Sequence, residues 1–596
     1  MQKPNLRQGS GRQACAHCSA PFEVTPEDLA FYDQVSPVIR GTKYAIPAPS
    51  LCPDCRQQRR LAFCNEFNLY PGTCGLCRKR TLSQFPQSSS VPYYCHECWH
   101  SDKWNALSYG REIDFTRPFF EQLTALKRSV PSLALDVQGE LQNCDYIHYA
   151  GSSKNSYLIM HADFCEDCMY GYGFKHNRSC VDGFYNLQCE LLYDCVDCHG
   201  SYGLTHCQDC INCHSGAFLR DCIGCKSCFL CTGLRNKEYC FENEQLTKEE
   251  YRERTQGIDL QSFKTYQECR ARRREIEKKH TFKEFHGHNT ENCAGDYLVH
   301  CKDTHASFDC ENVEHGKFCY QVVTGAKNVY DIYQYGLNLH ESLECTISGE
   351  NSYHLLFTLG GNVSCSDLLY CWYMENAKNC FGCANMTHAS YCILNRQYTK
   401  EVYEQLVPRL IVHMQKTPLR SFGATEGQTP LRSPSGSFAG YEWGEFLPVE
   451  MSLFGYNKTT AQMYYPLKKK DVLAEHWTWD DEEPQLPAVE KIIDAGKLPD
   501  STRDIPDDVL HWAIRCEVTG RPFKIQPQEL AFYREQKLPI PRRHWFQRHL
   551  DRFHLRNPRK FWKRKCAKCG REIQTTYSPE RPETVYCETC YLGEVY

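Results

Sequence analysis

Residues 207–231 read CQDCINCHSGAFLRDCIGCKSCFLC and form the densest part of a cysteine-rich centre. The surrounding positions alternate at intervals of 12 and 9 residues, which indicates a repeat of 21 residues: Cys168, Cys180, Cys189, Ser201, Cys210, Cys222 and Cys231. Turn-forming residues precede several of these positions, and apolar or aromatic residues precede others. A repeat this short predicts a β-solenoid, because paired-helix solenoids need more than about 30 residues per repeat.

The cysteine-rich centre is duplicated. The first half ends in YCFENEQLTKEEY and the second in YCILNRQYTKEVY, and the 9 and 12 spacing returns at Cys371, Cys380 and Cys392. A polar segment follows each half, and Thr247 and Thr399 are the expected helix N-caps. We expect one long charged helix over about 247–285 and an amphipathic helix over about 399–415.

The two ends of the chain are also copies of one module. PFEVTPEDLAFY at 21–32 and PFKIQPQELAFY at 522–533 align without a gap, and the pair Arg59-Arg60 aligns with Arg548-His549. The fold class expected is therefore mainly β with some α: zinc-ribbon modules at both ends, flanking a duplicated cysteine-rich centre that resembles a β-solenoid.

Three sets of paired CxxC motifs carry the strongest chemical signal. A CxxC turn lets two thiolates bind one ion, and a second pair completes a tetrahedron around zinc. Four protein ligands leave no open position, so the sites are expected to be structural, with at least three Zn²⁺ per chain. The predicted ligands are Cys15, Cys18, Cys52 and Cys55; Cys74, Cys77, Cys95 and Cys98; and Cys566, Cys569, Cys587 and Cys590.

A fourth set, expected in the second module, is degenerate. Cys516 aligns with Cys15, but Thr519 replaces Cys18. Counting back from the aligned arginines places His544 at the position of Cys55 and Pro541 at that of Cys52. We predict no metal at this copy. Its fold must therefore be stabilised by the packing of its apolar and aromatic residues alone.

The 26 cysteines between Cys144 and Cys392 admit two interpretations. They could bind further metal, or they could form an interior ladder in which a small thiol packs on every turn. Ser201 at one of the repeat positions favours the ladder, because serine is a poor zinc ligand. An iron–sulfur cluster is disfavoured, because no C-x2-C-x2-C-x3-C-P run is present.

Residues 542–565 combine basic and aromatic side chains, as nucleic-acid surfaces do. The alternative is that the aromatic residues pack in the degenerate module while the cations are solvated. The candidate contacts to RNA, DNA or a nucleoprotein such as the ribosome are Arg542, Arg543, Arg548, Arg552, Arg556, Arg559, Lys560, Lys563, Arg564 and Lys565.

These features divide the chain into eight segments. They are a tandem zinc-ribbon module (1–100), a helical connector (101–141), the first repeat half (142–246), a charged helical linker (247–291), the second half (292–398), a helix with a Pro/Gly/Ser linker (399–440), a small aromatic segment with a connector (441–515) and the second ribbon module (516–596).

Several longer segments resemble a known family. YSPERPETVYCETCYLGEVY, YGREIDFTRPFFEQL, PLKKKDVLAEHW and the pair LTKEEY and YTKEVY are similar to segments of multi-zinc-ribbon, cysteine-rich proteins of reduced-genome candidate-phylum bacteria. The resemblance spans nearly the whole chain. It implies zinc binding and a cytoplasmic location, and it implies no activity, substrate or catalytic residue.

Composition leaves the function open between three classes. The net charge of -4 predicts no partner by itself. The N-terminus MQKPNLRQGSGRQ has no apolar core, and no run of about 18 apolar residues occurs, so we expect neither export nor a membrane span. With 40 cysteines, reduced thiols in the cytoplasm are expected. A nucleic-acid-binding scaffold ranks first, a protein–protein scaffold second, and a metal store or redox enzyme last, because no P-loop, Rossmann, nucleophile-elbow or HExxH motif occurs.

Overall fold

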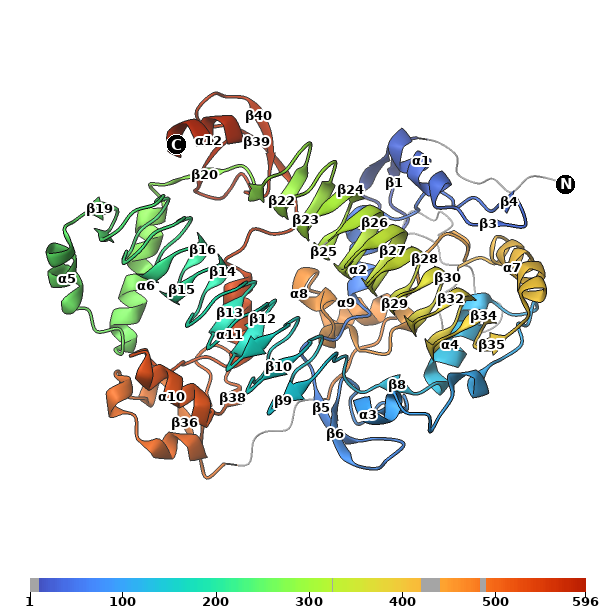
Figure 1. The fold of residues 1–596 in the computed structure, drawn as a ribbon, viewed down its shortest axis with the longest axis horizontal. Coiled ribbons are helices and arrows are strands. Elements are labelled where there is room, and N and C mark those ends of the chain that lie inside the picture. Colours follow the sequence, from blue (N-terminus) through green and yellow to red (C-terminus); the bar gives the residue numbers. More distant parts are fainter. Residues whose placement is uncertain (1–9, 324, 420–439, 483–488, 596) are drawn as a thin grey trace. The chain divides into compact units, whose positions relative to one another are not determined.

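The computed structural model describes residues 10–323, 325–419, 440–482 and 489–595 (Figure 1). Residues 1–9, which belong to the N-terminal segment expected not to direct export, lie outside this part. So do residues 420–439, which are most of the predicted Pro/Gly/Ser linker. The chain divides into two compact units. Unit 1 contains residues 1–134 and 286–482, and unit 2 contains residues 135–285 and 483–596. Each unit therefore joins one end-module to one half of the cysteine-rich centre.

Both halves of the centre are parallel β-solenoids, as the sequence predicts. The strands of the unit 2 solenoid are β9 (Leu141–Gln142), β10 (Ser153–Lys154), β11 (Cys165–Glu166), β12 (Met169–Tyr172), β13 (Val181–Phe184), β14 (Val196–His199), β15 (Tyr202–Thr205), β16 (Gln208–Ile211) and β17 (His214–Ala217). An antiparallel hairpin, β18 (Cys240–Phe241) and β19 (Glu244–Gln245), follows them.

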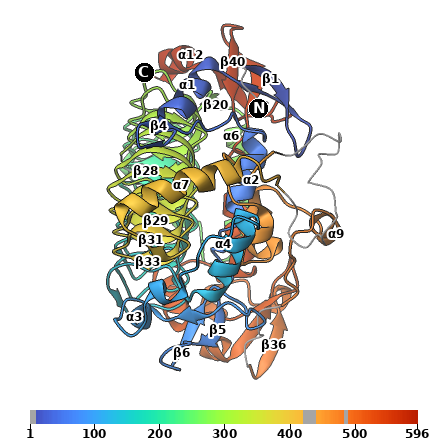
Figure 2. The ribbon, with the colours of Figure 1, turned by 90° about the vertical axis from the view of Figure 1, so that its right-hand side faces the viewer.

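The unit 1 solenoid has longer strands and forms one continuous sheet. They are β21 (Gly287–His288), β22 (Ala294–Val299), β23 (His305–Glu311), β24 (Val313–Lys317), β25 (Tyr320–Val322), β26 (Ala326–Tyr335), β27 (Leu339–Ser348), β28 (Ser352–Leu356), β29 (Leu359–Val363), β30 (Ser366–Leu369), β31 (Trp372–Glu375), β32 (Lys378–Phe381), β33 (Ala384–Thr387), β34 (Ser390–Ile393) and β35 (Arg396–Gln397). Figures 1 and 2 show α7 (Lys400–Met414) across the end of this stack, beside β34.

The rung of the solenoid has 12 residues, so the predicted repeat of 21 is wrong. In unit 2, Met169 pairs with Val181, and Val196 pairs with Gln208. Every third residue from 147 to 231 is buried. Two cysteines 12 residues apart therefore occupy the same place on successive rungs. Two cysteines 9 residues apart are separated by three steps from one inward position to the next. Both intervals are multiples of three, which explains the alternation seen in the sequence.

The backbone turns a corner at each third residue. The residue before nearly every inward position in the unit 2 solenoid has a left-handed conformation, with φ of 57° at Asp182, 51° at Tyr185 and 53° at Gln188. Such values are uncommon outside glycine and are kept only when surrounding structure enforces them. Here the hydrogen bonds between successive rungs enforce them. Several unit 1 rungs have 13 residues, as the pairing of Ala326 with Leu339 shows.

The long charged helix predicted over 247–285 is two helices, α5 (Lys248–Gln256) and α6 (Phe263–Glu277). Gly257 ends α5 and Ser262 caps α6, so the chain between them leaves the helical path. The predicted caps are confirmed, because the side chain of Thr247 accepts from Glu250 N and that of Thr399 accepts from Val402 N.

The segments outside the two solenoids supply the remaining α-helices and strands. In unit 1 they are β1 (Gly11–Ala14), β2 (Pro21–Val24), α1 (Pro26–Gln34), β3 (Val38–Ile39), β4 (Thr42–Lys43), α2 (Pro53–Leu61), β5 (Tyr70–Thr73), β6 (Arg80–Ser83), β7 (Tyr93–Tyr94), α3 (His96–Trp99), α4 (Phe119–Ser129), β8 (Ser132–Leu133), α8 (Ala461–Tyr464) and α9 (Lys469–Ala474). In unit 2 they are β20 (Thr281–Lys283), β36 (Lys491–Asp494), β37 (Trp512–Arg515), β38 (Pro522–Phe523), α10 (Pro527–Glu535), α11 (Trp545–Phe553), β39 (Trp562–Lys565), β40 (Glu572–Thr575), β41 (Thr584–Tyr586) and α12 (Glu588–Val595).

Candidate metal centres and the basic helix

The structure brings together the four thiols of each predicted zinc set. Within each set, the four Sγ atoms lie within 4.8 Å of one another. The closest pairs that span two motifs are 3.7 Å apart for Cys18 and Cys52, and 3.8 Å for Cys77 and Cys95. A tetrahedral ion with Zn–S bonds of about 2.3 Å requires S···S distances of about 3.8 Å. The donor set and its spacing therefore fit zinc.

The same backbone hydrogen bond organises all three sets. The N–H of Cys52 donates to Cys15 Sγ at 3.2 Å, and the N–H of Cys95 donates to Cys74 Sγ at 3.3 Å. The N–H of Cys587 donates to Cys566 Sγ at 3.3 Å. Burial raises the pKa of Cys74, but backbone N–H groups outweigh it and lower that pKa to about 6. This thiol is therefore prepared for the thiolate form that a metal needs.

The degenerate copy has a different alignment from the one expected. Ala16 N donates to Ser50 O in the first module, and Glu517 N donates to Arg542 O in the second. Since these bonds are equivalent, His544 stands at the position of Cys52, not of Cys55. The second copy is nine residues shorter between these points, and unit 1 has the β3–β4 hairpin there.

His544 has become a helix cap. Its Nδ1 accepts a hydrogen bond from Phe546 N at 3.1 Å, at the start of α11. Burial lowers the pKa of His544 to about 3, and the nearby guanidinium groups of Arg521 and Arg548 act in the same direction. The imidazole is therefore neutral and satisfies a backbone N–H that would otherwise lack a partner at the helix start.

Two of the ten candidate nucleic-acid contacts, Arg548 and Arg552, are buried and a third, Arg556, is largely covered, which corrects the sequence interpretation. Arg548 pairs with Asp182 and lies 3.3 Å from Glu529. Arg552 lies 3.0 Å from Asp182. Arg556, whose side chain is 9% exposed, lies 2.9 Å from a carboxylate oxygen of the solenoid residue Asp197. These guanidinium groups hold α11 against the unit 2 solenoid and are not presented to a partner.

Unit 1 contains the same arrangement. Arg56 and Arg60 on α2 each lie 2.9 Å from a carboxylate oxygen of Asp331, which is fully buried in β26. Glu344 lies one rung further along and contacts Arg60 at 3.3 Å. We call these contacts the arginine clamp: Arg56 and Arg60 on Asp331 in unit 1, and Arg548 and Arg552 on Asp182 in unit 2.

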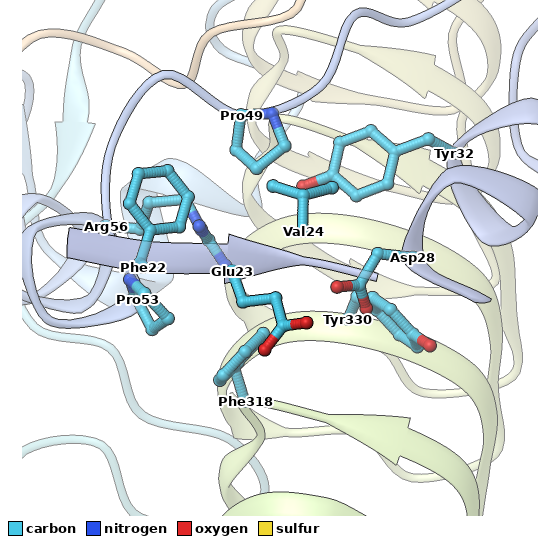
Figure 3. A pocket seen from close by; sticks show the side chains of 10 residues that line it. All are labelled: Phe22, Glu23, Val24, Asp28, Tyr32, Pro49, Pro53, Arg56, Phe318 and Tyr330. Carbon is cyan, nitrogen blue, oxygen red and sulfur yellow. The ribbon is translucent and has the colours of Figure 1, made fainter. Parts of the chain in front are cut away.

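A small cavity lies beside the unit 1 clamp. Figure 3 shows Arg56 and Tyr32 of the end-module around it, with Phe318 and Tyr330 from the solenoid. The Arg56 guanidinium carbon lies 5.1 Å from the Phe318 ring centroid. The cavity is about 10 Å³, which is about the space of one water molecule. It is a packing gap of the clamp rather than a ligand site.

Other candidate cations also have partners within unit 2. Arg542 lies over the Phe263 ring at 4.2 Å, and Arg543 pairs with Glu517 and Asp551. Arg564 donates to the carbonyls of Ser578 and Glu583, and Arg559 is partly buried. Lys560, Lys563 and Lys565 stay exposed, on and just before β39.

The interior cysteines make hydrogen bonds in both directions. Cys189 Sγ lies 3.2 Å from Leu187 O and 3.1 Å from Cys198 O, to which it donates. The N–H of Cys189 donates to the Asn177 side chain one rung earlier, at 2.9 Å. In the same way, the N–H of Leu219 donates to Cys207 Sγ one rung earlier, at 3.4 Å. Thiols therefore suit the interior because they are small and can both donate and accept, which supports the ladder interpretation.

Burial also keeps many of these thiols protonated. It raises the pKa of Cys189 to about 12 and that of Cys345 to about 11. Sequence reasoning missed the acidic partners of the clamp. The signal that could have found them is acidic residues one rung apart: Asp182 with Asp194, and Asp331 with Glu344.

No protein-family model and no curated protein matches this chain. None of the helices in the described part of the chain combines the length and the apolar character needed to cross a membrane. The functional argument therefore depends on the geometry described above.

Proposed function

We propose that the protein is a zinc-stabilised scaffold of the cytoplasm that contacts nucleic acid or a nucleoprotein through its ribbons. The observation that carries the proposal is the closed four-thiol geometry found three times. Such sites stabilise small domains and leave no position for a substrate. All 40 cysteines are free thiols, which fits a reducing compartment.

Metal content tests the zinc part of the proposal. We expect three zinc ions per chain after purification under reducing conditions, and two after Cys569→Ser. Cys189→Ser is the matched control, because it changes a solenoid thiol, and this variant should keep all three ions. Zinc that falls with Cys189→Ser, or stays at three with Cys569→Ser, contradicts the assignment.

The surface proposed for nucleic acid belongs to ribbon three, the ribbon that contains Cys566, Cys569, Cys587 and Cys590. It is formed by the exposed Lys560, Lys563 and Lys565 around Trp562. The Lys560 Nζ lies 5.5 Å from the Trp562 ring centroid, so a cation and a stacking ring stand together. Ribbon two, which contains Cys74, Cys77, Cys95 and Cys98, adds the exposed run Arg78-Lys79-Arg80. Neither surface belongs to the arginine clamp.

Salt-dependent binding to single-stranded RNA tests this surface. Each phosphate contact to a single strand contributes about 0.7 to the slope of log K against log salt. Changing the three ribbon-three lysines to Glu should therefore lower the slope by about 2. The control changes Lys237, Lys264 and Lys279 to Glu, three exposed lysines elsewhere in unit 2, and should leave most of the binding intact.

The burial of Arg548, Arg552 and Arg556 favours a second candidate, a protein–protein scaffold without nucleic acid. These three cations are covered by the solenoid, so they are not on the surface proposed to bind phosphates. A single stoichiometric protein partner that survives nuclease treatment, together with RNA binding that the three lysine changes do not affect, would favour this second function.

A further inference from the structure

Lys127 is a buried lysine in unit 1 that belongs to none of the metal sets and not to the arginine clamp. It lies on α4 and is 2% exposed. Its Nζ donates to Asn385 Oδ1 at 2.9 Å and to Ser132 Oγ at 3.1 Å. The Asn385 amide in turn donates to Pro131 O at 2.9 Å, so its oxygen is held towards the lysine. The amine is therefore fixed in position.

A cavity of about 20 Å³ adjoins this amine. Phe85, Trp372 and Phe454 contribute aromatic walls, and Glu375 supplies the one carboxylate among the described residues that line it. Trp99 also lines the cavity, and its Nε1–H has no hydrogen-bond partner among the described residues although Trp99 is only 4% exposed. A buried donor without an acceptor is costly, so this N–H is suited to an incoming oxygen atom.

The surroundings favour the neutral amine. Burial lowers the pKa of Lys127 to about 7. A neutral amine has two N–H bonds, which match the two acceptors Asn385 and Ser132, and this pairing leaves its lone pair free to attack. The rings of Trp372 and Tyr373 on β31 face it, with centroids 5.1 Å and 5.7 Å from Nζ. Glu375 on the same strand also lines the cavity.

We propose that this cavity is a reactive-amine site at which Lys127 condenses with a one-carbon carbonyl compound of the size of formaldehyde. The Nζ lone pair forms a bond to the carbonyl carbon, and the carbonyl oxygen takes the two amine protons and leaves as water. The product is an imine on Nζ. The Trp99 N–H donates to the oxygen as it gains negative charge. The cavity volume, about that of one or two water molecules, sets the size limit.

Reductive methylation of the full-length zinc-loaded chain tests the proposal. Formaldehyde and cyanoborohydride are added between about pH 6 and about pH 9, and methylated peptides are quantified by mass spectrometry. An ordinary lysine near pKa 10.4 reacts about tenfold faster per pH unit across this range. Lys127 should instead reach a constant rate above about pH 7.5, because its amine is already neutral there. Exposed Lys103 is the internal control.

Two variants separate the site from general reactivity. Lys127→Met should remove the constant-rate adduct while the zinc content stays unchanged. Trp99→Phe keeps a ring but loses the N–H, and it should slow the Lys127 reaction about tenfold without altering that of Lys103. A Lys127 rate that climbs like that of Lys103, or no Lys127 adduct while the exposed lysines react, overturns the proposal.

Discussion

The first end-module and its copy in unit 2 share a fold but differ in what holds it. The unit 1 module closes on Cys15, Cys18, Cys52 and Cys55, whose thiols lie within 4.8 Å of one another. The copy keeps Cys516 but has Thr519, His544 and Gln547 at the other positions. There, an N-terminal helix cap by His544 takes over part of the local role.

The arginine clamp, in contrast, is present in both units. Asp331 binds two guanidinium groups four residues apart on α2, and Asp182 binds two that are four residues apart on α11. A metal stabilises the module in which it lies, whereas the clamp fixes that module to a solenoid. The comparison shows that local packing can replace the metal inside a module. The clamp between module and solenoid, in contrast, is present in both units.

Metal removal should separate the two modules most strongly. Structural zinc contributes about 10–16 kcal/mol in small zinc-finger peptides at neutral pH. A chelator should therefore remove hydrogen-exchange protection from the amides of residues 15–55 in the unit 1 module and leave that of residues 516–547 in the copy in place. Loss of protection in both segments, or in neither, would show that the two modules do not differ in this way.

Breaking the clamp should cost less and should affect both units alike. Asp331→Asn or Asp182→Asn removes the carboxylate that two buried guanidinium groups share, and removing one partner of a buried pair costs about 3–5 kcal/mol. Denaturant unfolding measures the loss. Asp163→Asn is the control, because its pair with Lys175 is about one-third exposed and should matter little. Equal losses for Asp182→Asn and Asp163→Asn would refute the clamp.

Acid should act on the degenerate copy through His544. The folded state keeps this imidazole neutral, with a pKa of about 3, whereas the unfolded chain binds a proton below about pH 6.5. The free energy of unfolding should therefore fall, by up to a few kcal/mol, as the pH falls from about 6.5 towards about 3. His544→Asn keeps a capping side chain and should flatten this part of the pH profile. An unchanged profile would exclude His544 as its source.

The sequence predicted the three four-thiol groups well because a CxxC turn is local: four residues define it, whatever the rest of the chain does. The solenoid was predictable in kind but not in period. Cys180 and Cys189 differ by 9 and Cys189 and Ser201 by 12, and only the rung geometry shows that three is the common unit. Cysteines alone mark only some of the inward positions, so their spacing does not reveal the rung.

The clamp could not be predicted, because it joins segments that are far apart in sequence. Arg56 and Asp331 are 275 residues apart, and Arg548 and Asp182 are 366 apart. Without the pairing of modules with solenoids, the basic run around Arg548 looked like a surface for phosphates. The alignment of His544 failed for a similar reason, because a nine-residue difference in length lies between the two halves of each module.

The solenoid rungs also determine how the molecule responds to force. Each rung bonds only to the rung before and the rung after it, so a pull on one end loads a single ladder at a time. The hairpin of β18 and β19 and the α7 segment stand at the ends where such unzipping starts. Resistance to a mechanical load, such as an unfolding protease that pulls on the chain, is therefore set by these short terminal elements rather than by the long stacks behind them.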